Sequence, residues 1–219
     1  MAPHHDHARQ PRAPQALAVW RLEHARATDP LPHELAHAAI AHYTDLGDLV
    51  LVPNLRGGEL LQTAAALGRR ALPLTPQARS AKQAERVVPL HRDAGAALVL
   101  APLGARPTVR RIEQVAARLL PLLRDGGFLA LARRERARAS NGHGEVVRAC
   151  QRQGLQYWQH VVALTPDANA AIEARTESMY TKRAGDGRTV RCHRDLLVFR
   201  GPADAVVAQT AAADEAVAA

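Results

Sequence analysis

The chain of 219 residues is poor in aromatic residues, in lysine and in cysteine. Aromatic residues make up only 3% of it although 47% is hydrophobic, so the core must be built mainly from alanine, leucine and valine. Such a core suits helices packed on a sheet better than an aromatic-rich β-sandwich. The length fits one α/β domain with additional residues at both ends.

The two cysteines, Cys150 and Cys192, stand in no CxxC or Cys/His pattern. Neither a disulfide framework nor a zinc site is supported by that spacing, and a reduced cytoplasmic setting fits best. The longest apolar run is far shorter than the about 18 residues that a membrane-spanning helix needs, and the N-terminus has no apolar signal core. We therefore expect a cytoplasmic protein without membrane contact.

Positive charge comes almost entirely from arginine. Lysine and arginine number 29 against 21 acidic residues, a net charge of +8, and lysine occurs only at Lys82 and Lys182. A planar guanidinium holds phosphate oxygens bidentately, which favours a nucleic-acid partner such as DNA. The alternative is a GC-rich coding sequence that enriches arginine and alanine together. Net charge informs about association and not about fold, so both interpretations stay open.

Composition divides the chain into three parts. Residues 1–16 are polar and rich in histidine, and residues 203–219 are rich in alanine and mildly acidic, so we expect both tails to be disordered. The histidines around Asp6 are more typical of a solvated tail than of a metal site. The working domain is therefore 17–202.

Within this domain, strand-like and helix-like stretches alternate, which predicts a mostly parallel sheet with helices on both faces. The predicted helices span 32–43, 58–68, 77–86, 108–124 and 144–153. The predicted strands span 48–53, 71–74, 86–90, 97–102, 126–132, 157–164 and 195–200. The stretch 165–194 shows no regular pattern, and a connection of that length is usually functional or mobile.

The segment 48–68 is the most informative one, because a strand leads through a glycine turn directly into a helix. Gly57 and Gly58 supply this turn. A glycine turn lets the backbone approach a ligand, and the following helix start offers free N–H groups to it. The same pair also occurs where the backbone simply turns tightly.

A Pro-led helix, a Gly-Asp pair, a short apolar strand and a glycine turn follow one another in PHELAHAAIAHYTDLGDLVLVPNLRGGELLQTAAALGRRALPL. The positions that carry this pattern are Pro32, Gly47, Asp48, Val50, Leu51, Pro53, Gly58, Ala64 or Ala65, Leu67, Gly68 and Arg69. Here the chain resembles the DNA amino-methyltransferase family. The segments LHRDA, ALVLAPLG and HRDLLVFR resemble later motifs of that family, in family order, so the resemblance covers roughly residues 17–202.

The resemblance implies a Rossmann-like, three-layer class I methyltransferase sheet that is mostly parallel and closes with an antiparallel C-terminal strand hairpin. It also implies S-adenosylmethionine as the cofactor and an exocyclic amine of adenine or cytosine in DNA as the methyl acceptor. The target base must be flipped out of the duplex to be reached. The matching cofactor positions are Pro53, Asn54, Gly57, Gly58, Thr75 and Asp93.

Several of these positions depart from the family. Where the family has Asp-Pro-Phe, this chain has Val52, Pro53 and Asn54, so the acidic residue is missing. The acidic residue expected to hold the ribose hydroxyls falls on Thr75, which lacks charge and makes weaker hydrogen bonds. Asp93 is retained, either as the adenine contact or as a surface loop residue. The departures argue against ordinary cofactor binding.

The catalytic motif departs further. The family's polar residue, two prolines and aromatic residue fall on Ala101, Pro102, Leu103 and Gly104. Ala101 offers no acceptor to the target amine, and Gly104 offers no stacking surface. Losing such an acceptor commonly costs on the order of a hundredfold or more in rate, so weak or absent activity is expected.

Other residues are weaker candidates for function. The basic run Arg133, Arg134, Arg136 and Arg138 follows a strand end and is the best candidate for phosphate contact, with a solvated loop as the alternative. Three histidines, His33, His37 and His42, share a predicted helix but form no HExxH pattern, so ligation is not favoured. Tyr157 and Trp158 are expected to pack rather than to stack on bases.

Three hypotheses follow. The chain is a weakly active or non-catalytic relative of the DNA amino-methyltransferases; or it is a scaffold of the same fold that binds nucleic acid or a protein; or it methylates RNA or a small molecule.

Overall fold

The computed structural model describes residues 17–25, 31–53, 58–74, 95–104, 107–133, 142–166, 181–183, 189–191 and 193–203. A seven-stranded sheet has the order β1-β6-β9-β5-β4-β2-β3. Its strands are β1 (Leu17–Arg21), β2 (Leu49–Pro53), β3 (Arg70–Leu74), β4 (Ala96–Leu103), β5 (Leu123–Arg133), β6 (Gln156–Leu164) and β9 (His193–Arg200). Strand β9 runs antiparallel to both neighbours, whereas the other neighbouring pairs are parallel.

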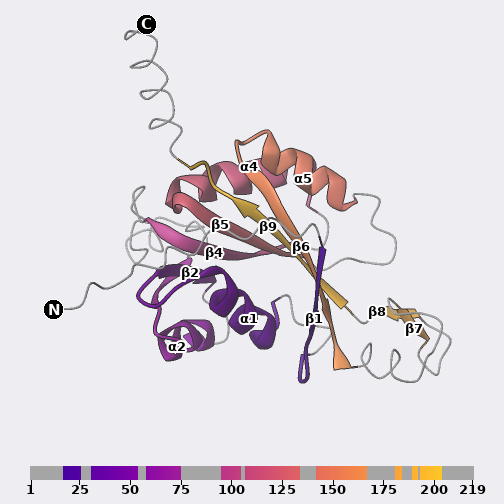
Figure 1. Cartoon of the computed structure of the whole chain (residues 1–219). Helices are drawn as coiled ribbons and strands as arrows, with labels where there is room; N and C mark the ends of the chain where they lie inside the picture. Colours follow the sequence, from indigo (N-terminus) through magenta and orange to yellow (C-terminus); the bar gives the residue numbers. More distant parts are fainter. Residues whose placement is uncertain are drawn as a thin grey trace, which may run out of the picture.

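Helices cover both faces of this sheet (Figure 1). They are α1 (His33–Tyr43) and α2 (Glu59–Ala66) on one face, and α4 (Val109–Leu119) and α5 (His143–Gln151) on the other. The central strands are apolar on both sides because both sides are covered. In β2, for example, Val50 and Val52 belong to the core under α1, and Leu51 to the core under α4. The predicted three-layer fold with its antiparallel C-terminal hairpin is confirmed.

Helix α4 is shorter than predicted. Thr108 caps it, because its Oγ1 accepts the N–H of Arg111 at 3.2 Å, and Ile112, Ala116 and Leu119 of the predicted apolar stripe are buried. The α-helix ends at Leu119 and continues as the 3₁₀ turn η2 (Leu120–Leu122), since a proline inside this turn cannot donate a backbone hydrogen bond. Strand β5 begins at once, three residues before its predicted start at 126.

Strand β1 was not predicted. It adds to the sheet beyond β6, in parallel register from Leu17 opposite His160 to Arg21 opposite Leu164. Its inward residue Trp20 packs on the core, whereas Leu17 is 58% exposed. The sequence LAVWR does not show this alternation, because the outward residues Leu17 and Val19 are apolar as well.

Some predicted elements lie outside the described residues, and one stretch without predicted elements contains two short strands. The predicted helix 77–86 and strand 86–90 lie outside the described residues, as do 1–16 and 204–219. In the stretch 165–194, where no element was predicted, β7 (Thr181–Arg183) and β8 (Thr189–Arg191) form a separate antiparallel ribbon. No described helix is long and apolar enough to cross a membrane.

The Gly-Asp pair of the family-like segment serves the turn before β2. Gly47 has φ +79°, which favours glycine, and donates its N–H to the carbonyl of Gly68 at 2.8 Å. The Asp48 carboxylate accepts the N–H of Asp45 at 2.8 Å and two guanidinium bonds from Arg124 at 2.6 and 3.1 Å. These contacts join the starts of β2 and β5, so this part of the motif is structural.

Four aromatic rings pack in a row beneath the sheet. Tyr43 lies between Trp20 and Phe128, with ring centroids 6.2 and 5.3 Å away, and Phe128 contacts Trp158 at 5.7 Å. The hydroxyl of Tyr43 donates to Oε1 of Gln159 at 2.5 Å, and both side chains are buried. This bond ties the end of α1 to β6.

The aromatic pair predicted to pack does so. Trp158 lies under the guanidinium of Arg200, 5.4 Å from its ring centroid, and Tyr157 packs edge-on against Phe199 at 5.9 Å.

Candidate functional site

The order in which the chain adds strands to the sheet reverses at β2. After β2 the chain adds β3 on one side, and it then returns to place β4 on the other side of β2, both parallel to it. In open parallel sheets, ligands bind outside the carboxyl ends of the strands at such a switch point. Pro53, Leu74 and Leu103 end these three strands. The edge that they form is the first candidate site.

Helix α2 begins at this edge. Its N-cap, Gly58, has φ +95°, and a Cβ there would meet only Cδ1 of Leu61 at 3.8 Å, so the left-handed backbone and not crowding requires glycine. The first N–H groups of an α-helix have no partner within the helix, and such groups can bind an anionic or polar ligand. The structure thus brings Pro53 and Gly58 of the predicted cofactor residues to the switch point. The others, Asn54, Gly57, Thr75 and Asp93, lie outside the described residues.

The end of β4, where the family has its catalytic motif, is apolar. Ala101 and Leu103 are each 5% exposed and pack in the core under α4, Pro102 is partly buried, and Gly104 is exposed. None of these four residues has a side-chain hydrogen-bond acceptor or an aromatic ring. At this position the chain itself provides neither of the two groups that the family uses on its target amine.

The prediction that Arg133 contacts phosphate needs correction. Arg133 is the last residue of β5 and only 2% exposed, so its guanidinium does not lie on the surface. It stands directly opposite Asp195 of β9, and directly opposed residues of an antiparallel pair point to the same face. Its predicted companions Arg134, Arg136 and Arg138 lie outside the described residues.

A group of imidazoles surrounds Asp195. The carboxylate is 2% exposed, and its Oδ1 lies 2.9 Å from Nε2 of His160 on β6. Its Oδ2 lies 3.2 Å from Nε2 of His143, the first residue of α5, and 3.8 Å from Nε2 of His193. We call His143, His160 and Asp195 the His-Asp cluster. It is the second candidate site.

Electrostatics favour the charged form of Asp195. Burial alone would raise the pKa of the carboxyl, but the neighbouring His143, His160 and His193 together hold that pKa well below its ordinary value. Asp195 is therefore a buried carboxylate that stays ionised at neutral pH.

The sequence interpretation did not find the His-Asp cluster. In the sequence, HRD at the start of the last strand belongs to a family-like segment, and His143 and His160 stand far from it in the chain. The available signal was an acidic residue directly before the apolar run LLVF, since an ionised group that a covered strand buries needs partners.

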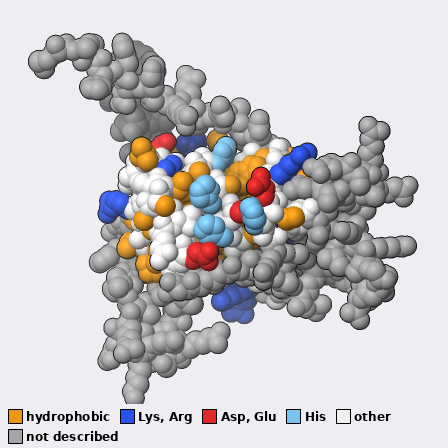
Figure 2. Space-filling view, turned by 90° about the horizontal axis from the view of Figure 1, so that it is seen from below, with side chains coloured by type: hydrophobic (Ala, Val, Ile, Leu, Met, Phe, Trp, Pro, Cys, Tyr) orange, Lys and Arg blue, Asp and Glu red, His pale blue; other side chains and the backbone are white. Residues whose placement is uncertain are grey.

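The histidines that were considered lie elsewhere. Histidine and acidic side chains gather on the face below the sheet (Figure 2), and α1 carries His33, His37 and His42. Nε2 of His33 lies 2.5 Å from Oγ1 of Thr63, and His42 packs against Trp20, whereas His37 is exposed. Among the described residues, the His-Asp cluster is the one group of three potential metal ligands whose ligand atoms lie within 4.8 Å of one another.

The sheet has the strand arrangement predicted for a class I methyltransferase. No family model matches the sequence, and no curated protein matches it. Solved structures with a similar fold include a geranyl diphosphate methyltransferase in complex with GPP and sinefungin, at 15% identity over 78% of each chain with a TM-score of 0.49.

A geranyl diphosphate C-methyltransferase from Streptomyces coelicolor A3(2) is 14% identical over 85% of this chain and 87% of that one, with a TM-score of 0.46. An S-adenosylmethionine-dependent methyltransferase from Methanosarcina mazei is 10% identical over 76% and 98%, with a TM-score of 0.45. These low scores add no argument about cofactor or substrate.

Proposed function

We propose that this chain binds S-adenosylmethionine at the carboxyl edge of β2, β3 and β4. The observation that carries the proposal is the switch point at β2, where α2 begins at the left-handed Gly58. The family-like segment supports the same site, because its strand, glycine turn and helix are the elements that meet there. By descent, the chain is then a relative of the DNA N6-adenine and N4-cytosine methylases.

We further propose that methyl transfer by this chain is weak or absent. A bound cofactor supplies the methyl group, but the target amine must be held, and Ala101 and Gly104 cannot accept its protons or stack on its base. Loss of such an interaction costs roughly 3–4 kcal/mol of transition-state stabilisation, or on the order of a hundredfold or more in rate. Binding of the cofactor and its use are therefore separate questions.

Calorimetric titration with S-adenosylmethionine tests binding. We expect micromolar affinity for the full chain and at least a tenfold loss in Gly58→Ala, because alanine strains the turn and adds a methyl group where the ligand approaches. Gly154→Ala is the matched control: Gly154 also has positive φ, at +88°, with nothing within 4 Å of a Cβ, but it follows α5. No heat up to millimolar ligand, or equal loss in both variants, contradicts the proposed site.

Transfer of a labelled methyl group tests activity. With cofactor bound, we expect incorporation into DNA to be lower by a factor of about a hundred or more than for an enzyme with the complete motif. Family-like rates on DNA would contradict the reasoning from Ala101 and Gly104. Incorporation into RNA or into a small molecule, with none into DNA, would favour a changed substrate.

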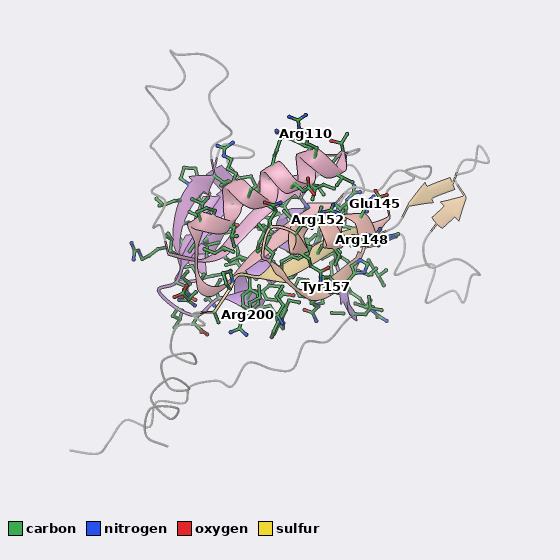
Figure 3. All side chains as sticks on the ribbon, turned by 90° about the horizontal axis from the view of Figure 1, so that it is seen from above. Arg110, Glu145, Arg148, Arg152, Tyr157 and Arg200 are labelled. Carbon is green, nitrogen blue, oxygen red and sulfur yellow. The ribbon has the colours of Figure 1, made fainter. Side chains whose placement is uncertain are left out.

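A second candidate function is a non-enzymatic scaffold that binds nucleic acid. Exposed arginines lie on the layer formed by α4 and α5, including Arg110, Arg148 and Arg152 (Figure 3). Arg152 also pairs with Glu113 at 2.8 Å, so this layer carries some compensating negative charge. Guanidinium groups on one helical layer are suited to a phosphate backbone.

Affinity for duplex DNA measured against salt tests this alternative. Replacing Arg110 and Arg148 by glutamine should reduce the slope of log affinity against log salt by about 1 for each arginine that contacts phosphate. Arg21→Gln, an exposed arginine on β1, is the control and should leave the slope unchanged. If the affinity for duplex DNA does not depend on salt, nucleic acid is excluded as the partner of the scaffold, and a protein partner remains.

A further inference from the structure

We propose that His143, His160 and Asp195 bind a divalent transition-metal ion, zinc in the first instance, where α5, β6 and β9 meet. The proposal is independent of cofactor binding at the switch point, because the two sites share no residue. Two imidazole nitrogens and one carboxylate oxygen form a donor set that suits zinc and non-haem iron, with coordination positions left for water or a further ligand.

The distances fit such an ion. Zinc bonds of about 2.0–2.2 Å at tetrahedral angles separate neighbouring ligand atoms by roughly 3.4 Å. The Asp195 oxygens lie 2.9 and 3.2 Å from Nε2 of His160 and His143, and the ligand atoms of the His-Asp cluster all lie within 4.8 Å of one another. Shifts of a few tenths of an ångström at the carboxylate, and a larger shift for a pair of ligand atoms near the 4.8 Å limit, would accommodate the ion.

A simple hydrogen-bond network accounts for only part of this arrangement. Nε2 of His160 can bond Oδ1 of Asp195 at 2.9 Å. Nε2 of His143 is placed less well: it is buried and lies 3.2 Å from Oδ2 of Asp195, but it makes no hydrogen bond of good geometry among the described residues. Both imidazole rings approach the same carboxylate through Nε2, with ring centroids 4.6 Å apart. A cation bound by both imidazoles and the carboxylate would give Nε2 of His143 a ligand bond in place of the poor hydrogen bond.

The position suits an ion that keeps an open coordination site. The side chains of His143, His160 and Asp195 are 31%, 19% and 2% exposed, so two partly exposed imidazoles cover a buried carboxylate. His193, whose Nε2 lies 3.8 Å from Oδ2, can supply a fourth ligand, and water is the alternative. The identity and number of these ligands are the properties by which a metal site is first judged.

Neighbouring charge limits the expected affinity. Arg133 stands opposite Asp195 on the same face of the sheet, and the N-terminus of α5 carries a partial positive charge. The positive charge of Arg133 and that of the helix N-terminus both repel a metal ion at the cluster. We therefore expect micromolar binding rather than the tighter binding of closed structural zinc sites.

The test uses the full chain with His4, His5 and His7 replaced by alanine, so that the histidine-rich N-terminus does not bind the ion. Metal-free protein is titrated with zinc, and bound zinc is counted after gel filtration. We expect one zinc per chain, with affinity lower by about tenfold or more in His143→Gln and in Asp195→Asn. His37→Gln, which changes an exposed histidine on α1, is the matched control and should bind as tightly as the parent.

Cobalt gives a second readout, because Co²⁺ in a four-coordinate site with histidine ligands absorbs visible light far more strongly than hydrated Co²⁺. Thermal unfolding of each metal-free variant checks that it folds. If Asp195→Asn does not fold, His143→Gln still tests the proposal, because His143 is a partly exposed residue at the start of a helix. Absence of saturable zinc binding, or binding of equal strength in the folded variants, overturns the proposal and leaves a hydrogen-bond network at the cluster.

Discussion

Removing one oxygen atom from Tyr43 should destabilise the fold measurably. The hydroxyl donates to Oε1 of Gln159 at 2.5 Å, and the two side chains are 7% and 6% exposed. In Tyr43→Phe the ring keeps its contacts with Trp20 and Phe128, but the amide oxygen of Gln159 is left buried without this donor. An unsatisfied buried polar group costs about 1–3 kcal/mol, so we expect a loss of that size in the free energy of unfolding.

The double variant separates this effect from packing. Gln159→Leu should cost a similar amount, because it leaves the Tyr43 hydroxyl buried without its acceptor. Burial raises the pKa of Tyr43 above its ordinary value, so the hydroxyl stays protonated and needs an acceptor at neutral pH. Replacing both partners removes both polar groups together, and Tyr43→Phe with Gln159→Leu should lie close to the parent.

Urea unfolding of the four proteins measures the coupling, and a melting curve provides a check at about 2–4 °C per kcal/mol for a domain of this size. We expect a coupling energy of about 1 kcal/mol or more between the two positions. Additive losses, with the double variant weakest of all, would refute the claim that the hydrogen bond and not the ring's surroundings joins α1 to β6.

Three further predictions concern the rest of the fold. Ile112→Ala in α4 should lower the free energy of unfolding by about 2–5 kcal/mol in urea, since the side chain is fully buried, and Ile112→Val should lower it by only about 0.5–1.5 kcal/mol. Burial raises the pKa of the Cys150 thiol to about 12, so in a Cys192→Ser background a thiol reagent at pH 8 should react only after denaturant is added; rapid labelling of the native protein would disprove this burial. Arg124→Gln should lower the free energy of unfolding by less than about 1 kcal/mol, because the arginine is half exposed. Asp48→Ala should lower it by more, because this change also removes the acceptor of a backbone N–H in the preceding turn. Only the contribution of the Arg124–Asp48 ion pair should become smaller at high salt.

Local sequence was sufficient where neighbours in the chain decide the structure. The run from Pro32 to Leu74 predicted α1, β2, α2 and β3 within a few residues, because its apolar spacing and its glycines at turns act over short distances. The same run predicted the glycine turn at the switch point. The apolar end of β4 was also readable, since Ala101 and Gly104 have no polar or aromatic side chain in any fold.

Contacts between distant segments were not readable in the same way. Strand β1 pairs with β6 across more than a hundred residues of sequence, so no neighbouring segment indicated that residues 17–21 join the sheet. Helix α4 was predicted too long because its apolar stripe continues through the 3₁₀ turn into β5, and periodicity alone does not separate the two.

The sequence by itself determined the three-layer class of the fold, the glycine at the start of α2 and the absence of polar side chains at residues 101–104, because each of these depends on residue type and local spacing. Only the tertiary structure decided that Arg133 is buried and that His143, His160 and Asp195 converge. The physical reason is the antiparallel β9, which runs back between β5 and β6 and brings its first residues to the carboxyl ends of both strands.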